Sequence, residues 1–149
     1  YPLQTFSKAD RLDYARIPFG VEANDPDTEA VLIQLARSVS KQVYQISSAE
    51  RAVLHTAAVF ANNFSTHLLG LARDILDHEQ LPFELLKPLI EQTFLKALAS
   101  DNPADGQTGP AVRGDWQSVN RHLLYLQEQN PEWAQLYRHL TESIRLKHL

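Results

Sequence analysis

Hydrogen-bonding side chains recur at four-residue intervals in an uncharged stretch of the sequence, residues 52–72. His55, Asn63 and His67 share this spacing with Val59, so in a helix the four residues would form one ridge. An imidazole titrates near neutral pH and can transfer a proton, while a carboxamide can orient a carbonyl, a hydroxyl or a cofactor amide. The spacing therefore predicts that His55 donates or accepts a proton and that Asn63 positions a substrate or cofactor. A buried, hydrogen-bonded pair that fixes helix packing is the alternative.

A second candidate site lies in residues 108–116, TGPAVRGDW. The planar guanidinium of Arg113 suits a carboxylate or a phosphate, which predicts an anion-binding role. The alternative is an ordinary surface ion pair with Asp115 or Glu91. Residues 113–115 also match the Arg-Gly-Asp cell-adhesion tripeptide, but three residues are weak evidence for that function.

The sequence lacks the usual metal and nucleophile motifs. A metal site built from His55, His67 and His122 would lack the close His spacing of zinc enzymes, and the chain contains no Cys. Neither a Gly-rich phosphate loop nor a Ser nucleophile elbow occurs. We therefore expect no metal site and no cysteine or serine nucleophile.

The composition limits the compartment and the partners. The 149 residues suffice for one domain with a hydrophobic core, and a net charge of −4 argues against non-specific nucleic-acid binding. The uncharged stretch is long enough to suggest a membrane span, but its His, Asn, Ser and Thr residues argue against one. The opening YPLQTFS does not resemble a signal peptide, and the sequence contains no Met. We expect a cytoplasmic chain that is the C-terminal part of a longer protein and contacts neither nucleic acid nor membrane.

A βαβ unit is predicted in the first third of the chain. Residues 17–23 and 41–46 have the composition and alternation of strands, and the apolar positions of residues 28–39 have helical spacing, with Asp27 or Thr28 as the expected cap. Two strands and one helix cannot bury both faces of a parallel sheet. We therefore expect further strands in another part of the protein or in another chain.

A long central helix is expected to follow this unit. Ser47 and Glu50 form the pattern of a capping box, and the helix would run to about His78. Because residues 52–72 carry no charge, the helix should be buried on nearly every face.

Three more helices are predicted after the central one. The first begins at Pro82, is kinked at Pro88 and ends near Ser100, and a turn is expected at Gly109-Pro110. Helices over residues 116–129, capped by Asp115, and from residue 131 to about 146 would follow. The predicted fold class is mainly α, a helical bundle around one long helix. Residues 1–46 would form the βαβ unit that completes a missing Rossmann sheet, and residues 47–149 an all-helical domain.

Five separated motifs give the chain a family resemblance. They are YPLQTFS, HTAAVFANNF, LPFELLKPLIEQTF, TGPAVRGD and HLLYL. In this order they resemble the C-terminal region of a bacterial family catalogued as domain of unknown function 2520, whose members are labelled NADP-dependent oxidoreductases. The resemblance implies an N-terminal Rossmann domain that binds NADP. It also implies a helical part similar to the C-terminal domains of 6-phosphogluconate dehydrogenase-like, pyrroline-carboxylate reductase-like and prephenate dehydrogenase-like enzymes. In those enzymes a long central helix lines the active cleft and commonly builds the dimer.

The resemblance also assigns roles to particular residues. His55 and Asn63 match the family's His and Asn in the central helix and would be catalytic. The family often begins this region with His, where this sequence has Tyr1, so a tyrosine hydroxyl would replace an imidazole. Residues 51–73 contain no Lys, so the mechanism of the related hydroxyacid dehydrogenases does not transfer unchanged. The residues that match the family's GP-x-x-RGD loop and its later His, and that would bind substrate, are Thr108, Gly109, Pro110, Arg113, Asp115 and His122, with Gly114 in the same loop.

The function expected from these features is the substrate-binding and dimerisation region of an NAD(P)-dependent oxidoreductase. The nicotinamide cofactor would be bound by the N-terminal domain, and the partners would be a second copy of the chain and a small-molecule substrate. No residue selects an imine over a ketone or a hydroxyacid. The alternative is a non-catalytic helical module that serves dimerisation or acts as a scaffold.

Overall fold

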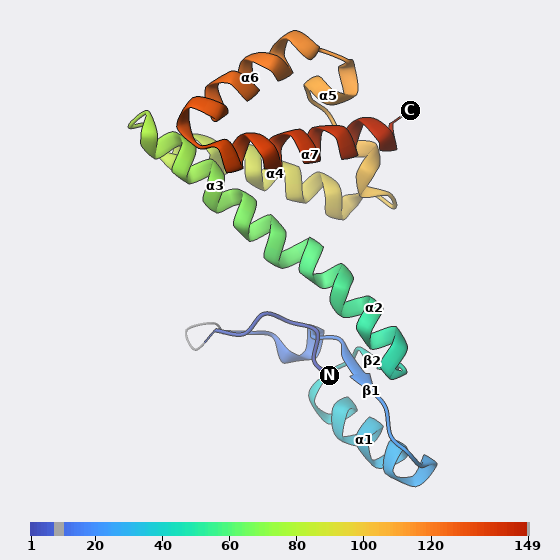
Figure 1. The fold of residues 1–149 in the computed structure, drawn as a ribbon. Helices are drawn as coiled ribbons and strands as arrows, with labels where there is room; N and C mark the ends of the chain where they lie inside the picture. The colour runs from blue at the N-terminus through green and yellow to red at the C-terminus, as the bar shows by residue number, and fades with distance from the viewer. Residues whose placement is uncertain (8–10, 149) are drawn as a thin grey trace. The chain divides into compact units, whose positions relative to one another are not determined.

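The fold of this computed structural model is mainly α, as predicted (Figure 1). The structure describes residues 1–7 and 11–148. The chain divides into two compact units, Tyr1–His67 and Leu68–Leu149. The first unit contains the small sheet and the second is helical. The predicted assignment of residues 1–46 to a larger Rossmann sheet stays a prediction.

The first unit contains the predicted βαβ arrangement. Strand β1 (Phe19–Val21) pairs in parallel with β2 (Val43–Gln45), and helix α1 (Pro26–Val39) connects them. The cap of α1 is Asp25 rather than the expected Asp27 or Thr28, because the Asp25 carboxylate accepts a hydrogen bond of 2.8 Å from the backbone N–H of residue 28. Both strands are shorter than predicted. Residue 18 is a proline, which has no N–H to give to a ladder.

The N-terminal segment extends this small sheet on its other edge. The backbone N–H of Gly20 donates to the carbonyl of Tyr1 at 2.8 Å, and that of Leu3 donates to Pro18 at 2.9 Å. A side chain at position 20 would overlap the side chain of Ile46, so any residue larger than glycine would force Ile46 to move. The segment is therefore fixed beside β1, which places the Tyr1 side chain.

The central helix begins at the predicted capping box. The backbone N–H of Ser47 donates to the Glu50 carboxylate at 2.8 Å, and the N–H of Glu50 donates to the Ser47 hydroxyl at 3.3 Å. The helix continues through α2 (Ser48–Ala58), the π-helical segment η2 (Val59–Phe64) and α3 (Ser65–His78). Both predicted ends are confirmed, whereas the π-helical segment was not predicted.

Replacing Ser47 by alanine is expected to destabilise the start of this helix. The substitution removes an N-cap side chain, which costs about 1 kcal/mol in typical helices. Urea unfolding of the two proteins at one pH measures the difference. Ser38→Ala is the matched control, because the Ser38 hydroxyl donates to the Leu35 carbonyl inside α1 and caps no helix N-terminus. Equal midpoints for the Ser47 variant and the parent protein would contradict the capping role.

The second unit is built around an α6–α7 hairpin. Asn130 lies between these helices, and its side chain caps α7 by accepting from the N–H of residue 132 at 2.9 Å. The hairpin buries Val119, Leu126 and Ala134. The elements of the unit after α3 are η3 (Phe83–Leu86), α4 (Lys87–Ala99), η4 (Pro103–Gly106), α5 (Pro110–Arg113), α6 (Trp116–Gln129) and α7 (Pro131–Lys147).

Two details of the predicted helices are wrong. The helix predicted to start at Pro82 and kink at Pro88 is a 3₁₀ turn, η3, followed by α4. Pro88 lies in the first turn of α4, where its missing N–H has no partner to lose. The turn expected at Gly109-Pro110 instead begins the short helix α5, which ends at Gly114 in the left-handed conformation (φ 67°).

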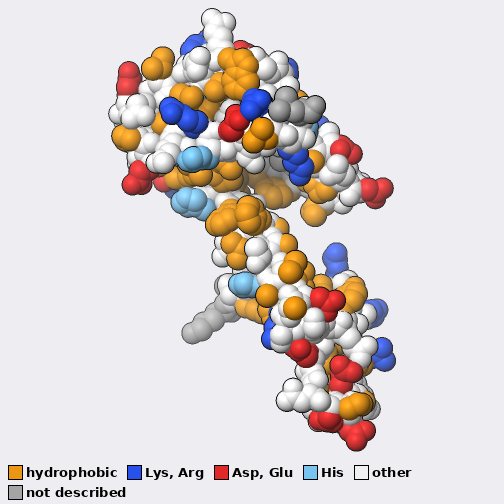
Figure 2. Space-filling model, turned by 45° about the vertical axis from the view of Figure 1, so that its right-hand side comes forward, with side chains coloured by type: hydrophobic (Ala, Val, Ile, Leu, Met, Phe, Trp, Pro, Cys, Tyr) orange, Lys and Arg blue, Asp and Glu red, His pale blue; other side chains and the backbone are white. Residues whose placement is uncertain are grey.

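The chain itself leaves much apolar surface exposed (Figure 2). The uncharged central helix was expected to be buried on nearly every face, yet no residue of α2, η2 or α3 is buried. Val53 is 71% exposed and Phe60 66% exposed. The expectation is therefore wrong for this chain alone, whose own elements do not cover the helix. In the part of the chain that the structure describes, no helix combines the length and hydropathy needed to cross a membrane.

Candidate functional site

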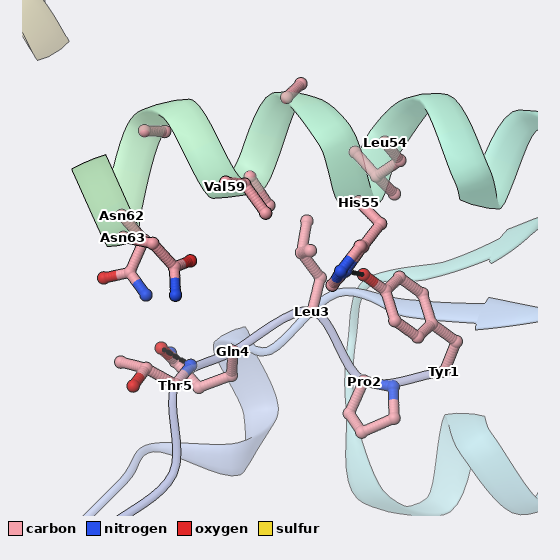
Figure 3. Close-up of a pocket in the computed structure, with 13 residues that line it drawn as sticks. Tyr1, Pro2, Leu3, Gln4, Thr5, Leu54, His55, Val59, Asn62 and Asn63 are labelled. Atoms are coloured by element: carbon pink, nitrogen blue, oxygen red, sulfur yellow. Dashed lines mark hydrogen bonds between the residues drawn. The ribbon is translucent and has the colours of Figure 1, made fainter. Parts of the chain in front are cut away.

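A groove of about 580 Å³ separates the N-terminal segment from the central helix (Figure 3). Residues 1–5 form one wall. The other wall carries four side chains that point from the helix toward the segment: His55, Val59, Asn62 and Asn63. His67, the last residue of the predicted ridge, does not line the groove. The structure thus brings together the two residues predicted to be catalytic.

His55 and Tyr1 form the only hydrogen bond that the described residues make across this groove. The His55 Nδ1 lies 3.3 Å from the Tyr1 hydroxyl, and either group can donate, depending on the imidazole tautomer. Both side chains are exposed to the groove. Such a pair can pass a proton between an imidazole, a phenol and a bound molecule. Sequence reasoning named Tyr1 only as a departure from a family pattern, and the structure gives it a place in the site.

The π-helical segment η2 presents two adjacent carboxamides to the groove. A π turn closes hydrogen bonds over five residues instead of four, so it is wider than an α turn. Asn62 and Asn63 both reach the groove from this turn. Just after the π turn, the Ser65 hydroxyl donates a hydrogen bond of 3.4 Å to the backbone carbonyl of Phe60. Isolated π turns in α-helices are frequent at functional sites. Asn62 was not predicted as a site residue, although two neighbouring Asn residues in an uncharged helix were a visible signal.

The start of the central helix is tied to the end of β1 by Glu22. The Glu22 carboxylate accepts hydrogen bonds from the Ser48 backbone at 2.8 Å and from the Ser48 hydroxyl at 2.6 Å, and it lies 3.4 Å from the Arg51 guanidinium. The hydrogen bonds from Ser48, and then the charge of Arg51, lower the pKa of Glu22 below its ordinary value of 4.5. This cluster fixes the helix that carries His55 relative to the sheet.

We expect this anchor to weaken in acid. Because the folded-state pKa of Glu22 is lowered, its contribution to stability is present above pH 4.5 and is lost as the pH falls through the lowered value. The backbone N–H resonance of Ser48 should therefore titrate with a midpoint below 4.5. In a Glu22→Gln variant this titration should disappear, while the resonances of the Ser47–Glu50 capping box still titrate. A Ser48 midpoint at or above 4.5 would contradict the arrangement.

The predicted anion-binding loop lies in the second unit. Arg113 is the last residue of α5 and is exposed. The ion pairs found among the described residues do not include Arg113, so neither the Asp115 nor the Glu91 pair of the alternative reading forms. The Asp115 carboxylate instead caps α6 by accepting from the Ser118 N–H at 3.0 Å. Hydrogen bonds from Ser118, with a smaller effect of the Arg113 charge, lower the pKa of Asp115.

The other predicted substrate-binding residues also belong to this unit. Thr108 is exposed, and Gly109 adopts a φ of 110°, a conformation that favours glycine, just before Pro110 starts α5. His122 lies on α6, and its Nδ1 is 2.8 Å from the Tyr137 hydroxyl on α7. The two rings meet edge to face with centroids 5.7 Å apart. His122 therefore contributes to the α6–α7 packing, and its role toward a substrate stays a prediction.

The βαβ unit does not fit a dinucleotide. A Rossmann pyrophosphate site needs a Gly-rich turn and a free helix N-terminus. The turn between β1 and α1, residues 22–25, contains no glycine, and the Asp25 carboxylate already occupies the N-terminus of α1. Among residues 1–7 and 11–148, no group of three His, Asp or Glu side chains could hold a metal ion. The residues of this chain thus supply neither a cofactor fingerprint nor a metal cluster in the described part.

A comparison with known protein families identifies the family of this chain. The sequence model of the family described as Domain of unknown function (DUF2520) matches residues 17–144, so the chain belongs to this family. The resemblance drawn from the five motifs is confirmed. No curated protein sequence matches the chain.

Two solved structures share the fold. A Bacteroides fragilis protein described as a "putative NADP oxidoreductase" is 40% identical, with a TM-score of 0.90 over 97% of this chain and 55% of that one. A Thermotoga maritima protein is 24% identical, with a TM-score of 0.79 over 99% of this chain and 60% of that one. The second similarity shows the fold alone. The chain thus spans little more than half the length of either solved structure.

Proposed function

We propose that this chain is the substrate-binding and dimerisation region of an NADP-dependent oxidoreductase. The proposal draws on the family membership and on the name of the Bacteroides fragilis relative. Because the βαβ unit does not fit a dinucleotide, NADP would be bound by a part of the protein outside these 149 residues. That relative is much longer than this chain, which leaves room for such a part. We place the protein in the cytoplasm.

The observation that carries the proposal is the Tyr1–His55 pair in one groove with two carboxamides that have no hydrogen-bond partner among the described residues. NADP supplies or takes a hydride in this class of enzyme. The reaction also needs a proton at the substrate's oxygen or nitrogen, and His55 donates or accepts it directly or through the Tyr1 hydroxyl. Asn63 holds the reacting group in position. The family resemblance also implies a substrate-binding role for Arg113 and its neighbours in residues 108–115, and for His122.

NADPH titration of the full-length protein tests this proposal. Quenching or enhancement of the cofactor's fluorescence should saturate as protein is added. A well-folded protein that leaves NADPH fluorescence unchanged would overturn the oxidoreductase proposal. That result would instead favour a non-catalytic module that serves association alone.

The exposed apolar faces support a dimer. The central helix exposes Val53 and Phe60, and helix α4 exposes Leu89 and Leu98 by 64% and 83%. Large apolar side chains that stay exposed on a helix commonly mark an interaction surface when they gather into a patch, as Phe60 does with Phe64. A second copy of the chain is the partner that we propose, with the central helix at the interface.

A further inference from the structure

We infer that the groove beside His55 binds a neutral group of the substrate that both donates and accepts hydrogen bonds, such as a carboxamide or a lactam. This inference rests on the proposed function and specifies the class of compound. The observations that carry it are the charges, the unpaired polar groups and the apolar contacts of the groove.

The first observation is the absence of full charge on the described walls. No Lys, Arg, Asp or Glu side chain lines the groove within residues 1–7 and 11–148. The nearest such cluster in the sequence, Glu22 with Arg51, is internally paired and lines a different cavity. A carboxylate or phosphate that left water for this groove would find no Lys or Arg side chain on the described walls, and burying an unpaired charge costs free energy. A neutral group pays a much smaller desolvation penalty.

The second observation is the set of free amide groups. Within the described part of the chain, the side chains of Asn62 and Asn63 have no hydrogen-bond partner. The oxygen of Gln4 accepts from the Thr5 N–H at 2.8 Å, which leaves its NH₂ group free to donate. Figure 3 shows the two Asn side chains and Gln4 on opposite walls of the same end of the groove. Carboxamides both donate and accept, so they best complement a ligand group that does the same.

The third observation is the apolar middle of the groove. Leu3 and Val59 lie between the amide end and the Tyr1–His55 pair, and Leu54 also lines the groove. A ligand that spans the groove therefore needs an apolar part next to its neutral polar group. Side chains of this kind would not hold a sugar or another polyol along their length.

A matched pair of probes tests the inference on the full-length protein. N-acetyl-leucinamide has a neutral amide and an apolar side chain, and N-acetyl-leucine replaces one amide by a carboxylate. Each probe is titrated at about pH 8, where the carboxyl group of N-acetyl-leucine is ionised, while the side-chain NH₂ resonances of Asn62 and Asn63 are followed by NMR. These resonances report on the groove itself, so an anion held by Arg113 elsewhere does not affect the readout.

We expect N-acetyl-leucinamide to shift both NH₂ resonances and to bind at least about tenfold more tightly than N-acetyl-leucine. Asn63→Leu should abolish this preference, whereas Asn120→Leu, on an exposed position of α6, should keep it. Equal or tighter groove binding of the carboxylate, or no shift with either probe, would overturn the inference. The comparison of the two probes on the parent protein decides the matter even if the Asn63 variant fails to fold. If the groove prefers the amide but the protein does not bind NADPH, the proposed function is contradicted. The inferred selectivity of the groove is then still supported.

Discussion

Replacing His55 by glutamine in the full-length protein is expected to lower kcat by about 10²- to 10⁴-fold, the range that a general acid or base contributes. The His55 Nδ1 lies 3.3 Å from the Tyr1 hydroxyl. A glutamine side chain can also form a hydrogen bond at this position, but it cannot transfer a proton. The measurement is steady-state NADPH oxidation with the protein's substrate, recorded as a pH profile. The parent profile should contain one ionisation that the variant lacks.

His67→Gln is the matched control for this substitution. His67 lies on the same helical stretch, three turns beyond His55, but it does not line the groove. Its replacement should change kcat by less than about threefold, since it leaves the groove's hydrogen bonds intact. Equal losses in the two variants would mean that His55 acts on the helix and not on the chemistry.

The second large effect is expected on assembly. Phe60→Glu should raise the dimer dissociation constant by about 30-fold or more, because the substitution buries an unpaired charge at a contact centre. Phe60 is 66% exposed in this chain, and its ring contacts that of Phe64 edge to face. Sedimentation equilibrium of the full-length protein measures the change.

Leu124→Glu provides the comparison, because Leu124 is 68% exposed on α6 and lies outside the central helix. This variant should dimerise like the parent protein. A parent protein that sediments as a monomer, or a Phe60 variant that dimerises unchanged, would contradict the proposed interface.

The helix boundaries were predictable because their causes are local. Ser47, Asp115 and Asn130 each place a side-chain oxygen where a helix leaves N–H groups unpaired. Such caps act within three residues of sequence, so the sequence indicates them, although at α1 several neighbouring candidates left Asp25 unpredicted. The ridge of His55 and Asn63 was predictable for the same reason, since helical spacing sets it.

The features that sequence missed depend on contacts or on small energy differences. A π turn differs from an α turn by one residue in its hydrogen-bond ladder, and no residue of the VFANNF segment dictates it. A proline kinks a helix when it lies in the interior, but it is well tolerated in the first turn. Because the chain forms the short η3 turn before α4, Pro88 lies in the first turn of α4. Tyr1 reaches His55 because the N-terminal segment pairs with β1, a contact between residues far apart in sequence. Local spacing in the sequence therefore could not predict that Tyr1 lies within hydrogen-bonding distance of His55.

The exposure of the central helix was not predicted for a different reason. Its lack of charge predicted that it is covered, and within this chain it is not. Hydropathy reports that a surface avoids water, but it does not say which chain covers that surface. The exposed Phe60 and Val53 favour the proposal that a second copy of the chain covers the central helix.

The most direct test of the central claim is a crystal structure of the full-length protein with NADPH. The proposal predicts that the nicotinamide C4 faces the groove between Tyr1 and Asn63, with room for a substrate atom about 3–3.5 Å from both C4 and the His55–Tyr1 pair. A nicotinamide bound away from this groove, with His55 and Asn63 facing solvent or another protein surface, would contradict it.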